Sequence, residues 1–173
     1  MVIPSRGNRK GCSIGGAGAL QYSAIGSGQT PVVLLHGLFG GPENWRSIME
    51  DLADHYRFFA LQLPTGPDEV RRHADVRSIS QLTDCVERFF AEAGLNQAVL
   101  CGNSLGGQVA IDFCLRHPNR VQGLVLAGSA GLFERNVTSG KRLRHCRSMI
   151  REQACKIFHN PVHVTDELVE SIY

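Results

Sequence analysis

The chain has 173 residues, a length typical of one domain that can bury a sizeable core. Hydrophobic residues make up 43% of it and charged residues 20%, which excludes a disordered or fibrous chain and predicts a soluble globular protein. The net charge of +2 indicates no nucleic-acid partner, and the absence of any apolar run of about 18 residues predicts no membrane span.

The cysteines indicate free thiols rather than a disulfide framework. None of them forms a Cys-x-x-Cys pair, and several fall in segments that we expect to be core strand or helix. The basic residues Arg6, Arg9 and Lys10 are followed by no apolar core, so the N-terminus does not resemble a secretory signal. We therefore predict a cytoplasmic protein with no metal site and no cofactor. The six cysteines are Cys12, Cys85, Cys101, Cys114, Cys146 and Cys155.

Two strands are expected in the first part of the chain. Residues 1–16 are polar and glycine-rich, which predicts a flexible N-terminus. Residues 19–24 predict an edge strand, closed by the glycine-containing turn at 26–28. Residues 31–35 are continuously apolar, as in a strand that is buried on both faces of a parallel sheet, and a glycine-rich loop follows them.

Helices and strands then alternate. Apolar residues at helical spacing predict a packing helix over 42–56. Residues 57–63 predict the next strand, which a turn containing proline and glycine ends. A further helix begins at Ser78 or Ser80 and ends at Gly94, because serine caps helix starts and glycine favours helix ends.

A strand, a sharp turn and a helix meet at Ser104. Residues 98–103 form an apolar run too short for a helix, a Gly-x-Ser-x-Gly pattern spans its end, and helical periodicity then continues to His117. A serine at such a turn adopts a strained conformation that exposes its hydroxyl, so Ser104 is the candidate nucleophile. Residues 121–127 predict one more buried strand.

This alternation predicts an α/β fold with a mostly parallel sheet and helices on both of its faces. In such sheets, ligands bind at the carboxyl ends of the strands. The loop after 31–35 and the turn at Ser104 both lie at that end. We therefore expect them to form one site.

The two motifs together resemble those of the α/β-hydrolase family. The resemblance rests on the Gly-Asn-Ser-Leu-Gly-Gly turn at 102–107 and on the pair His36 and Gly37 after a buried strand. In that family, the loop after such a pair supplies a backbone N–H to the oxyanion hole. By resemblance the donor here is Leu38, with Phe39 as the alternative.

The resemblance also implies the rest of the oxyanion site. Leu105, just after Ser104, supplies the second N–H donor. His36 precedes Ser104, whereas the family order is serine, acid, histidine, so we expect His36 to orient the loop rather than act as a base. Residues 62–66 depart from the Asp-x-Pro-Gly-x-Gly turn of many relatives, which leaves the catalytic assignment unaffected. The glycines of the elbow and the loop are Gly37, Gly102, Gly106 and Gly107.

The acid and the histidine that would complete a catalytic triad are not identified, so we expect the 173 residues alone to be inactive. The family places both after later strands, and no strand pattern follows 121–127. Glu134 is the one acid at a position that some relatives use, and no histidine is assigned. We expect residues 17–133 to be the front part of a hydrolase core and 134–173, where basic residues are in excess, to begin a helical cap. The basic excess predicts a solvated helix face, with an anion-binding surface as the alternative.

The resemblance implies a serine hydrolase that cleaves a carboxylic ester or similar acyl bond through an acyl-enzyme. Two alternatives stay open. One is a carbon–carbon bond hydrolase of ring-fission products, which the Gly-Asn-Ser-Leu-Gly-Gly turn also resembles, and the other is an inactive relative or interaction module. The expected partner is a small-molecule acyl substrate, not a nucleic acid or a membrane, and a homodimer is possible.

Overall fold

A computed structural model describes residues 20–38, 40–65, 78–132, 147–157 and 160–172. The chain divides into two compact units, Met1–Glu134 and Arg135–Tyr173. The segment 1–16, for which we predict flexibility, lies outside the described residues.

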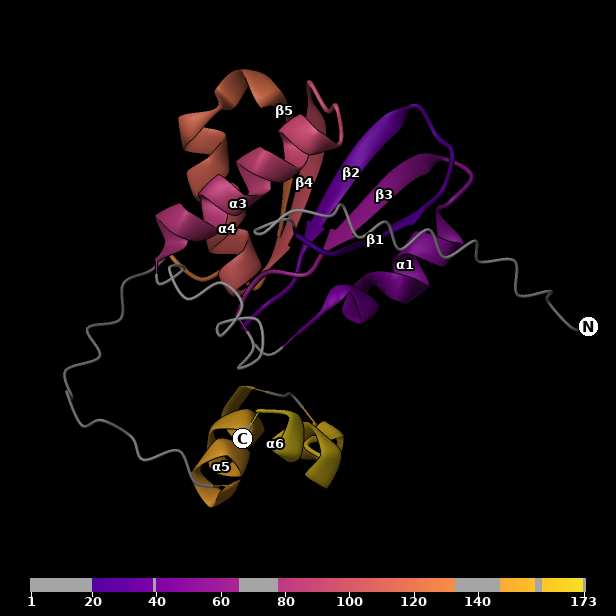
Figure 1. Cartoon of the computed structure of the whole chain (residues 1–173). Helices are drawn as coiled ribbons and strands as arrows, with labels where there is room; N and C mark the ends of the chain where they lie inside the picture. Colours follow the sequence, from indigo (N-terminus) through magenta and orange to yellow (C-terminus); the bar gives the residue numbers. More distant parts are fainter. Residues whose placement is uncertain (1–19, 39, 66–77, 133–146, 158–159, 173) are drawn as a thin grey trace, which may run out of the picture. The chain divides into compact units, whose positions relative to one another are not determined.

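The first unit is built on a five-stranded sheet with the strand order β1-β3-β2-β4-β5 (Figure 1). Strand β1 runs antiparallel to β3, and the other neighbouring pairs are parallel. The mostly parallel sheet and the edge position of the first strand confirm the predicted α/β fold. The strands are β1 (Tyr22–Ile25), β2 (Thr30–Leu35), β3 (Tyr56–Leu61), β4 (Ala98–Asn103) and β5 (Val121–Ala127).

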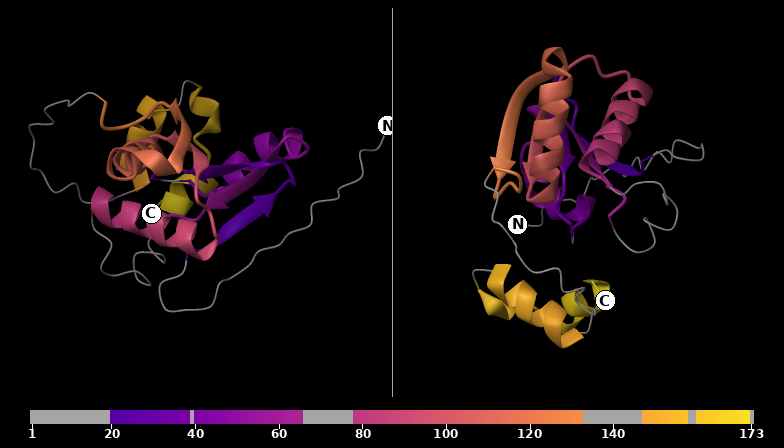
Figure 2. Two further views of the ribbon diagram at one scale, coloured as in Figure 1. Left: turned by 90° about the horizontal axis from the view of Figure 1, so that it is seen from above. Right: turned by 90° about the vertical axis from the view of Figure 1, so that its left-hand side faces the viewer.

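Helices cover both faces of the sheet (Figure 2). Side chains alternate along β2, so Val33 and Leu35 join the cluster of α3 and α4, whereas Val32 and Leu34 pack with Met49 of α1. A strand covered on both faces needs apolar residues at every position, which explains the continuous run in the sequence. The helical elements are η1 (Pro42–Trp45), α1 (Arg46–Asp51), α3 (Ile79–Glu92), α4 (Leu105–Arg116) and η2 (Pro118–Arg120).

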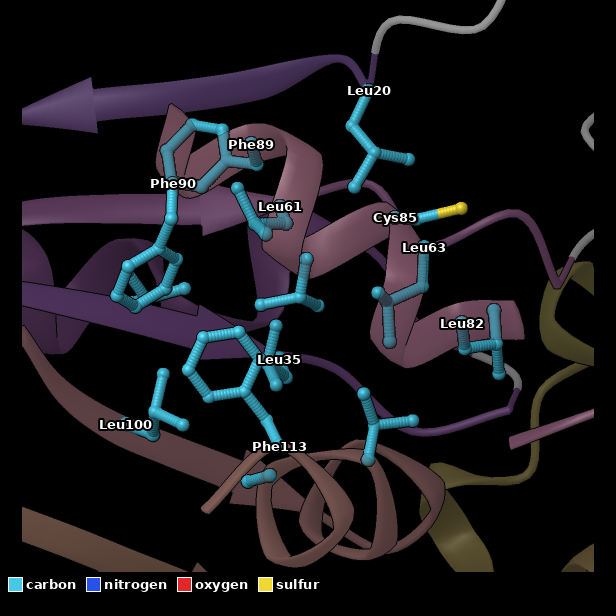
Figure 3. Packing of buried hydrophobic residues seen from close by; sticks show 14 of the residues in the cluster. Leu20, Leu35, Leu61, Leu63, Leu82, Cys85, Phe89, Phe90, Leu100 and Phe113 are labelled. Atoms are coloured by element: carbon cyan, nitrogen blue, oxygen red, sulfur yellow. The ribbon is translucent and has the colours of Figure 1, made fainter. Parts of the chain in front are cut away.

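The larger core lies between the sheet and the pair α3 and α4 (Figure 3). Phe90 of α3 and Phe113 of α4 place their ring centroids 4.7 Å apart, and both side chains are fully buried. The predicted caps of α3 are present, since Ser78 Oγ accepts from the Gln81 N–H at 3.2 Å and Gly94 follows the helix with φ 64°. This core holds β4 and α4 firmly on either side of the turn that joins them.

Two sequence predictions in this unit are wrong in part. The helix predicted over 42–56 ends at Asp51, and Tyr56 begins β3, where it pairs with Thr30. The Leu52 carbonyl accepts from both the His55 and the Tyr56 N–H, so the chain turns there instead of continuing the helix. Strand β5 has the predicted bounds but is not buried: Leu124 and Val125 are 38% and 54% exposed, because β5 pairs on one side only within the described residues.

The second unit contains α5 (Arg147–Ile157), η3 (Pro161–His163) and α6 (Asp166–Ile172). Its described core is a cluster of four buried residues, to which α5 and α6 both contribute. Whether this unit begins a cap stays a prediction. None of the helices that the structure describes is long and apolar enough to span a bilayer. The cluster consists of Ile150, Ala154, Val164 and Val169.

Candidate active site

Ser104 lies at the turn between β4 and α4, as the sequence predicts. Its backbone angles are φ 50° and ψ −115°, and it is the only non-glycine residue with positive φ among those the structure describes. An L-residue in this region carries steric strain of about 1–3 kcal/mol, which persists only where the surrounding structure imposes it. The strained turn gives the Ser104 side chain a direction that a regular strand or helix would not.

The last residue of β5 and the segment after it hold this turn in place. The Ser104 N–H donates to the Ala127 carbonyl at 3.1 Å, and the Ser104 carbonyl accepts from the Ala130 N–H at 2.9 Å. The Asn103 side chain adds a third bond, from Nδ2 to the same Ala127 carbonyl at 3.0 Å. The Ser104 N–H is therefore tied to the end of β5, and the Ser104 carbonyl to the segment that follows it.

The glycines of the turn at 102–107 let neighbouring parts of the chain approach more closely than a side chain at these positions would allow. A Cβ at Gly106 would lie 2.2 Å from the Leu35 carbonyl oxygen at the end of β2, and one at Gly102 would lie 2.4 Å from the Gly106 carbonyl oxygen. A Cβ at Gly107 would lie 2.4 Å from Ser129 Oγ. The start of α4 thus rests directly against the end of β2 and against Ser129, which follows β5.

The loop after β2 reaches the same point. A Cβ at Gly37 would lie 3.3 Å from Ser104 Cβ and 3.0 Å from Asn103 Oδ1, so the loop and the turn are in contact, as we expected. Within the described part of the chain, the amide N–H groups of Leu38 and Leu105 donate no hydrogen bond. That Leu38 and Leu105 are oxyanion donors stays a prediction, and Phe39, the alternative donor, lies outside the described residues.

His36 is buried beneath this loop, with 1% of its surface exposed. Its Nε2 accepts from the Leu63 N–H at 2.9 Å, and its Nδ1 donates to the Gly37 carbonyl at 2.7 Å. Burial lowers the pKa of His36, a shift that the bond to Gly37 and the charge of Glu43 oppose. A neutral imidazole with both nitrogens bonded to backbone fits the loop-orienting role and offers no free base.

No triad partner is visible beside Ser104 in the parts the structure describes. Glu134 lies outside the described residues. His117 has its Nε2 3.5 Å from a Glu87 carboxylate oxygen and its ring 4.9 Å from that of Phe113. Asp112 lies 3.5 Å from the Arg116 guanidinium. The Asp112 contact lies within α4, whereas the contact of His117 with Glu87 joins the end of α4 to α3.

Cys101 of β4 lies three positions before Ser104 in the chain but is not favoured as the nucleophile. The described residues hold no cluster of three or more metal-ligating side chains. Burial raises the pKa of Cys101 to about 11, so its thiol is protonated at neutral pH and is a poor nucleophile. The sequence did not predict that Ala127 and Ala130 hold Ser104. They do so through a backbone carbonyl and a backbone amide, which no particular residue type signals.

The chain is similar to known proteins over most of its length. The family described as alpha/beta hydrolase fold matches residues 30–155. The chain is 30% identical over 164 residues to a dihydrolipoyllysine-residue acetyltransferase component of the acetoin cleaving system of Pseudomonas putida, covering 92% of this chain and 44% of that protein. It is 33% identical to the pimeloyl-[acyl-carrier protein] methyl ester esterase of Edwardsiella ictaluri, covering 78% of this chain and 51% of the esterase.

Among solved structures, the meta-cleavage product hydrolase from Pseudomonas fluorescens IP01 superimposes with a TM-score of 0.68 at 26% identity. The superposition covers 89% of this chain and 59% of that structure. The chain thus spans about half the length of the curated relatives described above.

Proposed function

The chain belongs to the alpha/beta hydrolase fold family, and from this premise we propose that the protein cleaves carboxylic esters through Ser104. The observation that supports this most is the positive φ of Ser104 at the strand-to-helix turn, in contact with the loop that carries Leu38. The likeness to an esterase that acts on a methyl ester adds to it.

In the proposed reaction, Ser104 Oγ attacks the acyl carbon while a general base takes the hydroxyl proton. The electron pair of the carbonyl moves to its oxygen, which then accepts hydrogen bonds from the N–H groups of Leu38 and Leu105. The oxyanion collapses, the C–O bond breaks, and the alcohol leaves with the proton from the base. Water then attacks the acyl-enzyme by the same steps and releases the acid.

Replacing Ser104 by alanine tests this proposal. In a complete version of the protein, we expect the Ser104→Ala variant to lose at least about a thousandfold in kcat for a p-nitrophenyl ester and to lose labelling by a serine-directed phosphonate. Labelling that persists at another serine would show that the nucleophile is wrongly assigned. An unlabelled wild-type protein without activity would favour the inactive relative or interaction module.

Carbon–carbon bond cleavage of ring-fission products is the second candidate. It is favoured by the likeness to the meta-cleavage product hydrolase. Such substrates are carboxylates, and a basic segment could gather them. Two basic residues of this segment, Arg147 and Arg151, however form ion pairs with Glu170 and Asp166. Because these ion pairs compete with a substrate carboxylate, they favour the ester as the substrate.

A direct competition between substrates separates the two candidates. We expect p-nitrophenyl esters of short acids to have a higher kcat/KM than vinylogous diketone acids. A strong preference for the diketone acid, lost on neutralising Arg144 and Arg147, would reverse the ranking.

We further propose that the protein acts in the cytoplasm on a small-molecule acyl substrate. Free thiols among the described residues support the reducing compartment. They are Cys85, Cys101, Cys114 and Cys155.

A further inference from the structure

The carbonyl of Ser104 accepts three hydrogen bonds. The Gly107 and Gln108 N–H groups at the start of α4 donate to it at 3.0 and 3.2 Å, and the Ala130 N–H donates at 2.9 Å. In a planar trans peptide, the carbonyl and the N–H that follows it point in opposite directions. Holding the Ser104 carbonyl therefore fixes the direction of the Leu105 N–H, a proposed oxyanion donor.

The donor from Ala130 differs from the other two. Gly107 and Gln108 belong to the helix that begins right after Ser104, so their N–H groups move with it. Ala130 belongs to the segment after β5 and ties the Ser104 carbonyl to a separate part of the sheet. Whatever holds Ala130 in place therefore decides how firmly the carbonyl is oriented.

The side chain of Ser129 holds this segment against α4. Its Oγ donates to the Ala130 carbonyl at 2.8 Å. A Cβ built at Gly107 would lie 2.4 Å from Ser129 Oγ and 2.7 Å from Ser129 Cβ. The Ser129 side chain thus fills the space that a side chain at position 107 would need.

Glycines on both sides of Ser129 shape the turn after β5. Gly128 has φ 53° and Gly131 has φ 82°, values that residues with a side chain rarely adopt. A Cβ at Gly131 would lie 2.8 Å from Gln108 Cγ, so this glycine also lies against α4. Because glycine restricts the backbone little, the side-chain contacts of Ser129 are needed to fix the segment.

We propose that Ser129 is a positioning residue for the oxyanion hole. Its contacts keep the Ala130 N–H on the Ser104 carbonyl, and that carbonyl in turn orients the Leu105 N–H toward the oxyanion. Ser129 acts through the backbone and not by touching the substrate. This role rests on the proposed function only in its assignment of Leu105 as an oxyanion donor. The contacts of Ser129 stand on the structure itself.

Amide hydrogen exchange in the 173-residue chain, followed by NMR, tests whether Ser129 holds Ala130. Ser129→Gly removes the hydroxyl and the Cβ, so the Ala130 amide should exchange at least about tenfold faster, measured relative to the Leu34 amide in β2. Ser129→Ala keeps the Cβ over Gly107 and should have a smaller effect. Ser78→Ala is the matched control, because it removes a serine hydroxyl that caps α3, and it should leave this ratio unchanged.

The contact with Gly107 allows a reciprocal test. Gly107→Ala alone should displace the Ser129 segment, because the added Cβ would lie 2.4 Å from Ser129 Oγ. Combined with Ser129→Gly, the nearest remaining atom is the Cα at position 129, at 3.1 Å, which a small shift relieves. In the double variant, the added methyl group replaces the lost contact from the other side. Its Ala130 amide should exchange within about threefold of the wild type and more slowly than in either single variant.

Ester hydrolysis by a complete version of the protein tests the link to catalysis. With kcat expressed per active site titrated by a phosphonate, Ser129→Gly should lower kcat about tenfold and change KM by less than about twofold. A misdirected donor weakens the hold on the oxyanion, whereas the ground-state ester does not depend on it. The double variant with Gly107→Ala should recover kcat to within about threefold, and Ser78→Ala should leave it unchanged.

Three results would overturn the proposal: unchanged Ala130 exchange in Ser129→Gly, a double variant that exchanges faster than Ser129→Gly alone, or a kcat per titrated site that Ser129→Gly does not lower. Failure of the proposed function shows separately, as activity that survives Ser104→Ala. The exchange results do not depend on that activity.

Discussion

The turn at 102–107 and the unit of α5 and α6 are held together in opposite ways. At the turn, backbone atoms meet without intervening side chains, and the hydrogen bonds of Ser104 join backbone to backbone. In the second unit, four buried side chains form the described cluster, and exposed pairs such as Arg147 with Glu170 complete it.

The two regions differ in how easily their contacts can adjust to a substitution. A backbone contact at van der Waals distance cannot yield without moving a strand, whereas an exposed ion pair exchanges its partner for water at little cost. Substitutions at the turn should therefore be severe and insensitive to salt. Those at the exposed pairs should be mild and salt-dependent.

The largest effect is expected from Gly106→Ala. The added Cβ would lie 2.2 Å from the Leu35 carbonyl oxygen, so α4 or β2 must shift, at a cost of at least about 3 kcal/mol in the free energy of unfolding. Urea unfolding measures this loss.

Gly123→Ala in β5 is the matched control. Its Cβ would lie 3.7 Å from the methyl groups of Val99, an ordinary contact, so unfolding should change by less than about 1 kcal/mol. Equal losses at Gly106 and Gly123 would contradict the steric explanation.

A smaller effect is expected at Ser104 itself. Glycine adopts φ 50° without the strain of a Cβ, so Ser104→Gly should be more stable to urea than Ser104→Ala by about 1 kcal/mol. Both variants lack the hydroxyl, so the comparison isolates backbone strain. If the alanine variant were the more stable of the two, the turn would carry no strain.

The smallest effect is expected for Glu170→Gln in the second unit. Losing the carboxylate should speed amide exchange in α5 and α6 by at most about fivefold, and about 0.5 M NaCl should remove most of the difference. Hydrogen exchange followed by NMR measures both. A much larger increase in amide exchange that salt does not reduce would show that this ion pair is as rigid as the contacts of the turn.

The same pair predicts a pH dependence. The hydrogen bond from Arg147 lowers the pKa of Glu170 from its usual 4.5. The stabilisation is therefore complete above pH 4.5 and is lost as the pH falls through the lower folded value. Glu170→Gln should show no such loss.

The sequence by itself determined the elements whose signals are local. The continuous apolar run of β2, the Ser78 cap and Gly94 predict their elements because burial, capping and positive φ each demand particular residue types. The bounds of β5 and the turn at Ser104 were predictable for the same reason.

Only the tertiary structure decided the contacts between distant segments. Tyr56 joined β3 rather than a helix because strand pairing with Thr30 outweighs helical spacing. The partners of Ser104, the Ala127 carbonyl and the Ala130 amide, are backbone groups that every non-proline residue has, so no residue type announces them. The contact of Gln62 with His36, 26 positions apart, arises because β2 and β3 end side by side in a parallel sheet.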